Sequence, residues 1–120
     1  MEKQKGKVVI KRVEDNVVPD PGTGQAIPID RSGQVPLVIA AGGETNTLAD
    51  PAFRGQEMMI YAYSVAGGGT RAVSAASRVN VAAQKIMTFD AEGDMVVLKA
   101  GVSPSGPVWA IIANDGVALS

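Results

Sequence analysis

The sequence contains no cysteine and no histidine. The lack of cysteine excludes disulfide bonds and thiol nucleophiles, and the lack of both residues excludes zinc sites built from them. A Ser-His-Asp triad is excluded as well, because it needs an imidazole base. The sequence therefore predicts a protein that is not an enzyme and that holds no metal and no cofactor.

Aromatic residues, charge of one sign and long hydrophobic runs are also scarce. Eleven Lys and Arg stand against twelve Asp and Glu, so we expect no general electrostatic binding to nucleic acid or to an anionic membrane. No apolar run approaches the roughly 20 residues of a membrane-spanning helix. The lysine-rich start also lacks the apolar core of a signal peptide. These absences predict a soluble protein made in the cytoplasm.

Glycine and proline are plentiful, with 14 and 7 residues among 120. They divide the chain into short runs rich in Val and Ile, which favour strands over helices. The length suits one domain with its own core. We therefore predict an all-β fold, a small β-sandwich or barrel-like body that carries an extended N-terminal arm.

The predicted arm covers residues 1–34. Its first fourteen residues hold five Lys or Arg against two Glu, a net charge of +3, so the other 106 residues of this chain of net charge −1 sum to −4. A short strand is expected at residues 8–13, followed by a stretch rich in Pro and Gly in which a regular ladder is improbable. Taken alone, these residues fit a solvated tail or an anchor on an acidic surface equally well.

The predicted body covers residues 35–120. Strands are expected at residues 35–41, 57–65, 108–113 and 117–120, and also within residues 71–84, where the apolar residues alternate. Residues 85–89 and 95–100 are expected to form a hairpin, and residues 45–56 a structured corner. The expected core draws on nine residues: Val38, Ile60, Ile86, Phe89, Val97, Leu98, Trp109, Ile111 and Ile112.

The acidic turn that holds Asp90, Glu92 and Asp94 has two interpretations. Clustered carboxylates can bind calcium, but the twelve-residue spacing of an EF-hand is missing. A solvated turn is the preferred interpretation. Asp50 and Arg54 are expected to form a local surface ion pair at most.

Three segments resemble small β-rich structural proteins of tailed bacteriophages. They are TNTLADPAFRGQ, KIMTFDAEGDMVVLKA and VWAIIANDGVALS, and the resemblance spans about Thr45 to Ser120. It is greatest to capsid decoration (cement) proteins. Such proteins bind the outer surface of the assembled head as trimers and stabilise the shell. The resemblance thus implies a place on the virion, the major capsid protein as partner and a homotrimer.

Two sets of residues follow as hypotheses. The strand at residues 57–65 has apolar residues on both faces, which suggests that one face meets another subunit. The expected subunit interface comprises Met59, Tyr61, Tyr63 and Trp109. The expected capsid-binding residues lie in the arm, where an apolar strand would enter pockets on the shell and cations would meet acidic patches: Lys3, Lys5, Lys7, Val8, Val9, Ile10, Lys11 and Arg12.

Two other functions stay open at this point. A protein associated with the phage tail or with a head fibre is one, although the chain shows neither long repeats nor a coiled-coil stalk. A non-catalytic carbohydrate-binding module is the other, although only 4% of the residues are aromatic.

Overall fold

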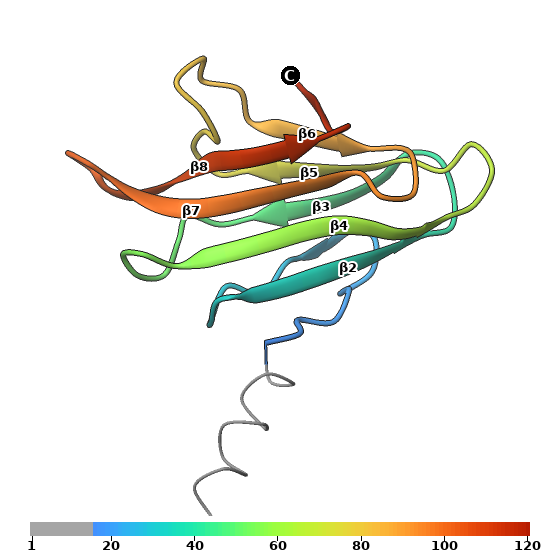
Figure 1. Cartoon of the computed structure of the whole chain (residues 1–120), viewed down its shortest axis with the longest axis horizontal. Helices are drawn as coiled ribbons and strands as arrows, with labels where there is room; N and C mark the ends of the chain where they lie inside the picture. The colour runs from blue at the N-terminus through green and yellow to red at the C-terminus, as the bar shows by residue number, and fades with distance from the viewer. Residues whose placement is uncertain (1–15) are drawn as a thin grey trace, which may run out of the picture.

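The computed structural model describes residues 16–120, and these form an all-β domain, as predicted from the sequence (Figure 1). The expected capsid-binding residues, Lys3 to Arg12, lie outside the described residues. The strands within the described range are β1 (Gln25–Ala26), β2 (Gly33–Ile39), β3 (Glu44–Leu48), β4 (Glu57–Val65), β5 (Arg71–Ala75), β6 (Ile86–Phe89), β7 (Met95–Ser103), β8 (Gly106–Asp115) and β9 (Ala118–Leu119).

The strands form two mixed sheets. The four-stranded sheet has the order β2-β4-β7-β8, and the five-stranded sheet has the order β1-β3-β5-β6-β9. From β1 to β5 the chain alternates between the two sheets, so that consecutive strands lie in different sheets. The pairs β1–β3, β2–β4 and β3–β5 are therefore parallel, and the remaining pairs are antiparallel. This winding brings together residues that are far apart in the sequence.

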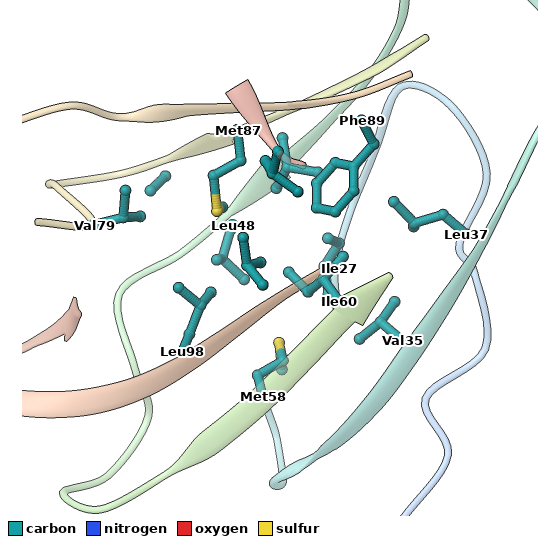
Figure 2. Packing of buried hydrophobic residues seen from close by; sticks show 14 of the residues in the cluster. Ile27, Val35, Leu37, Leu48, Met58, Ile60, Val79, Met87, Phe89 and Leu98 are labelled. Carbon is teal, nitrogen blue, oxygen red and sulfur yellow. The ribbon is translucent and has the colours of Figure 1, made fainter. Parts of the chain in front are cut away.

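The hydrophobic core lies between the two sheets (Figure 2). Alternation along β2 and β4 turns every second side chain inward, for example Val35 and Leu37 in β2 and Met58 and Ile60 in β4. The five-stranded sheet supplies residues such as Leu48 and Phe89 to the same core. One core thus holds both sheets together.

The predicted core is right in part. Ile60, Phe89, Leu98 and Trp109 are buried, and Ile111 packs against the core while half-buried. Four of the nine predictions are wrong. Val97 is half-buried on the outer side of β7, because Val96 and Leu98 are the residues that point inward from that strand. The other three side chains are exposed by 36–58%: Val38, Ile86 and Ile112.

The predicted boundary between arm and body is also wrong for residues 16–34. Val18 and Ile27 are 1% and 2% exposed and belong to the core. β1 pairs with β3, and β2 begins at Gly33, before the expected start of the body. Gly33 is required where the two segments meet, because a Cβ there would collide with the backbone oxygen of Asn16. The folded unit therefore includes residues 16–34.

The connections differ from those expected. β6 and β7 do not form a hairpin: β6 pairs with β5 and β9, whereas β7 pairs with β4 and β8. The acidic turn between them carries the chain from one sheet to the other. β5 ends at Ala75, so the strand expected across residues 71–84 is short, and the corner expected at residues 45–56 begins with strand β3.

Candidate interaction surface

The outer side of the four-stranded sheet is apolar over its central strands. Because Met58, Ile60 and Ala62 point into the core, Met59 and Tyr61 point outward from β4. Met95 and Val97 point outward from β7 in the same way. We call these four outward residues, Met59, Tyr61, Met95 and Val97, the apolar face. Tyr63, 67% exposed, and Val38, 52% exposed, lie at one end of it.

The register of β4 and β7 sets the residues of the apolar face in pairs. Tyr61 lies opposite Met95, and Met59 lies opposite Val97. The next pair along is Glu57 and Lys99, whose Oε2 and Nζ atoms lie 3.4 Å apart in an exposed ion pair. The apolar face is thus bordered at this end by one positive and one negative charge.

A hollow of about 320 Å³ opens beside this charged end. Asn16, Gln34, Glu57, Met59 and Val97 are among its lining residues. It is a surface depression that continues the apolar face toward β2 and offers both apolar contact and a carboxylate.

Three of the four residues expected at a subunit interface lie together. Met59 and Tyr61 belong to the apolar face, and Tyr63 lies at its end. The expectation for Trp109 is corrected: its side chain is 1% exposed within a single chain, and its Nε1 donates a hydrogen bond of 2.8 Å to the carbonyl oxygen of Ala49. Trp109 has no surface to offer to another subunit.

The edge strand β2 is closed by the segment that precedes β1. Val17 forms a parallel bridge with Gln34. The N–H of Val18 donates to the oxygen of Gln34, and the N–H of Gln34 donates to the oxygen of Asn16, both at 2.7 Å. Farther along β2, Pro36 has no N–H to offer. A further strand therefore finds few free partners on this edge.

Val38 completes the closure of β2 through side chains. Its N–H donates to Oδ2 of Asp20 at 2.9 Å, and its carbonyl oxygen accepts from Nη2 of Arg71 at 3.0 Å. The edge strands of the other sheet, β1 and β9, have two residues each. Short and covered edges discourage strand addition. The fourth edge strand, β8, is ten residues long, and its Ile111 N–H donates to the oxygen of Val79. The apolar face is therefore one candidate surface for association, and the outer edge of β8 is another.

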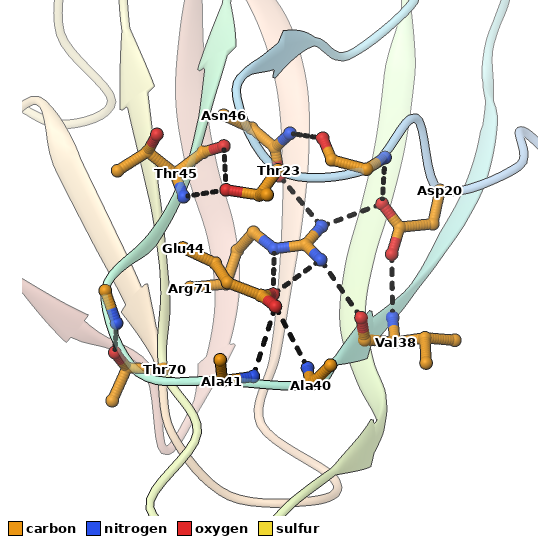
Figure 3. Close-up of polar contacts among 12 residues, drawn as sticks. Asp20, Thr23, Val38, Ala40, Ala41, Glu44, Thr45, Asn46, Thr70 and Arg71 are labelled. Atoms are coloured by element: carbon orange, nitrogen blue, oxygen red, sulfur yellow. Dashed lines mark hydrogen bonds and ion pairs between the residues drawn. The ribbon is translucent and has the colours of Figure 1, made fainter.

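Arg71 lies at the centre of a buried polar cluster that holds the early segment in place (Figure 3). Its side chain is 2% exposed, and its Nη1 and Nη2 atoms lie 2.7 Å from Asp20 and from Glu44, respectively. Nη1 also donates to Oδ1 of Asn46 at 3.0 Å. Asn46 in turn donates to the oxygens of Gly22 and Gln25. The cluster joins residues 20–25 to both sheets.

The polar groups of the cluster satisfy one another. Among the described residues, no buried side-chain nitrogen or oxygen lacks a hydrogen-bond partner. The sequence did not identify Arg71 as a functional or structural residue. Arg71 lies two and four residues before Val73 and Ala75, which are buried, so all three share one face of the strand. This spacing was the one available signal that the Arg71 side chain points inward.

Two carboxyl groups in the cluster have lowered pKa values. Burial alone would raise the pKa of Asp20, but hydrogen bonds from Arg71, Val38 and Gly22 and the charge of Arg71 lower it overall. Burial alone would also raise the pKa of Glu44. The hydrogen bond and charge of Arg71, together with hydrogen bonds from the N–H groups of Ala40 and Ala41, outweigh this effect and lower the pKa overall. Both groups are therefore ionised in the folded protein at neutral pH.

This cluster predicts a loss of stability in acid. Because folding lowers both pKa values, the ionised carboxylates stabilise the native state above their ordinary values of 3.8 for Asp20 and 4.5 for Glu44. That contribution is lost as the pH falls through the lowered values, so we expect the free energy of unfolding to decline from about pH 5 downward. Urea unfolding across this range should show a shallower decline for Asp20→Asn. An identical decline in both proteins would contradict the assignment.

The acidic turn is held by its own carboxylate. Oδ2 of Asp94 accepts hydrogen bonds from the N–H groups of Asp90 and Ala91 at 3.0 and 3.1 Å. Asp94 is 8% exposed. Within residues 16–120, no group of three or more acidic side chains is arranged to hold a metal ion. These contacts give Asp94 a structural role in the turn between the sheets.

Comparisons with known proteins gave no match: no family model, no curated protein and no solved structure matches the chain. In the described part of the chain, no helix is long and apolar enough to span a membrane.

Proposed function

We propose that this chain is a structural protein of a tailed-bacteriophage virion, a decoration protein that binds the outer surface of the assembled head and stabilises the shell. The single observation that supports it best is the apolar face on the outer side of the four-stranded sheet. An apolar patch on a protein surface is typical of a contact with another protein. The sequence resemblance supplies the kind of assembly, with the major capsid protein as partner and trimers as the arrangement.

The residues that carry the resemblance hold the domain together. In the first segment, the buried side chain of Gln56 accepts from the N–H of Ala52 and donates to the oxygens of Ile29 and Arg31. Trp109 of the last segment bonds to Ala49 of the first. The resemblance thus falls on residues that fasten the fold, as expected for proteins that share a scaffold.

Residues 2–14 are the proposed anchor on the shell. Their five cations and the apolar run of Val8, Val9 and Ile10 suit a strand that adds to a sheet edge of an acidic surface. Three copies acting together would strengthen a weak single contact through effective concentration.

The test is binding to heads stripped of their decoration protein, from the phage that encodes this chain. We expect the full chain to cosediment with the heads and the protein lacking residues 2–14 to remain folded and unbound. A variant with three fewer cations, Lys3→Gln with Lys5→Gln and Lys7→Gln, should bind more weakly than the wild type at low salt and should lose less of its binding when salt is added. Full binding by the truncated protein would overturn the role of the anchor, and no binding by the full chain would contradict the proposed function.

A further inference from the structure

We propose that the apolar face is a two-fold contact between two copies of this chain. The register of β4 and β7 determines which residues would meet. Consider a two-fold axis that runs parallel to the strands, between β4 and β7, just outside the four-stranded sheet. Rotation about it lays β4 of one copy over β7 of the other. Each outward residue of β4 then contacts a β7 residue of the partner copy. That residue has the same number as the one that lies opposite it in its own chain.

This arrangement is self-complementary for the outward pairs of β4 and β7. Tyr61 lies over the partner's Met95, and Met59 lies over the partner's Val97, because these residues are paired in the register of β4 and β7. Aromatic rings and thioether sulfurs make favourable contacts, and two apolar side chains exclude water. An isologous contact of this kind makes every such pair twice.

The charges at the end of the apolar face also match. Glu57 and Lys99 are register partners, so the two-fold axis sets Glu57 opposite the partner's Lys99, and Lys99 opposite the partner's Glu57. Opposite charges thus face one another in both positions, without a like-charge pair. The hollow lined by Glu57, Met59 and Val97 leaves room beside these residues for the side chain of the partner's Lys99.

The available area sets an upper limit on the strength of the contact. The whole outer side of the four-stranded sheet, with strands about 4.8 Å apart and seven residues at about 3.3 Å each, measures roughly 450 Å² per copy, and the apolar face is its central part. Two copies bury at most about twice that area, below the range of about 1,200–2,000 Å² for stable complexes. The contact is therefore weak in dilute solution and becomes effective where copies are held close together.

The place of this contact in the virion rests on the proposed function, whereas the contact itself does not. If copies sit as trimers on a closed shell, two-fold axes lie between neighbouring threefold axes. The apolar face would then join neighbouring trimers. A network of such contacts would reinforce the shell from outside, and effective concentration would compensate for the weakness of each.

Charge reversal with complementation tests the two-fold contact. The wild type should dimerise in sedimentation equilibrium at protein concentrations up to about 1 mM, as a weak interface of this size predicts. Glu57→Lys and Lys99→Glu each place like charges opposite one another in both positions, so each should weaken dimerisation about tenfold or more. An equimolar mixture should restore association, because a mixed dimer again pairs opposite charges at both positions.

Two further variants control the experiment. Tyr61→Lys, in the centre of the apolar face, should abolish dimerisation. Thr47→Lys, at an exposed position on the outer side of the five-stranded sheet, should leave it unchanged. Circular dichroism checks that each variant is folded.

Three results would overturn the proposal: a monomeric wild type at 1 mM, a mixture that does not associate, or dimerisation that survives Tyr61→Lys. Binding of the same variants to heads is scored separately. Charge-reversal variants that bind heads but do not dimerise leave the proposed function intact, whereas a dimerising wild type that ignores heads contradicts that function alone.

Discussion

Replacing Arg71 with leucine is expected to lower the free energy of unfolding by about 3–5 kcal/mol, the cost of breaking a buried ion pair from one side. The guanidinium is 2% exposed and bonds to both Asp20 and Glu44 at 2.7 Å. Without it, two largely buried carboxylates lose their counter-ion, and the oxygen of Val38 loses its donor. In a domain of this size the melting temperature should fall by roughly 12–20 °C.

Two variants make the Arg71 result specific. Arg54→Leu removes an exposed arginine and should change the stability by no more than about 0.5 kcal/mol. Arg71→Leu combined with Asp20→Asn and Glu44→Gln removes the uncompensated charges, so it should be more stable than Arg71→Leu alone. A loss below about 1 kcal/mol in Arg71→Leu would show that the cluster does not fasten the fold.

Replacing Trp109 with alanine is expected to cost about 3–5 kcal/mol, the range for deleting a large buried aromatic side chain. Trp109 is 1% exposed, and its indole N–H bonds to Ala49. The milder Trp109→Phe keeps most of the packing but leaves the Ala49 oxygen without its donor, at a cost of about 1–3 kcal/mol. Chemical unfolding followed by circular dichroism measures both.

Ile112→Ala is the matched control, because Ile112 lies in the same strand and is 58% exposed. We expect a change of about 0.5 kcal/mol or less. If Trp109 belonged to a subunit interface, Trp109→Ala would abolish association and leave the monomer stable. That outcome would contradict its assignment to the core.

Periodicity predicted the strands better than it predicted their partners. Alternation in residues 57–65 correctly separated inward Met58 and Ile60 from outward Met59 and Tyr61. The same alternation cannot distinguish a hairpin from a turn between two sheets, because both keep the inward residues inward. Residues 85–100 were therefore expected to pair with each other, whereas β6 and β7 lie in different sheets.

The wrong core residues have local causes. Val38 lies one position from buried Leu37 and Ile39, so the alternation of β2 turns it outward. In β8, a register shift opposite Val97 and Leu98 interrupts the alternation, and Ile112 is left exposed. A shift of this kind depends on the neighbouring strand and has no signature in the strand's own sequence.

The early segment was misjudged because its contacts are distant in sequence. Val18 and Ile27 are isolated apolar residues among prolines and glycines, so neither forms a local pattern. Asp20 finds its partner Arg71 only after the chain has crossed between the sheets several times. Of the candidate interface, the sequence indicated Met59, Tyr61 and Tyr63. Met95 and Val97 join them only through the register of β4 and β7.

The central claim, that this chain decorates a phage head, is tested most directly by cryo-electron microscopy of purified virions with protein mass spectrometry of the same particles. We expect the chain to be present in hundreds of copies, as two-sheet β domains grouped in threes on the outer surface of the shell. Its absence from the particles, or its presence in a few copies on the tail alone, would contradict this claim.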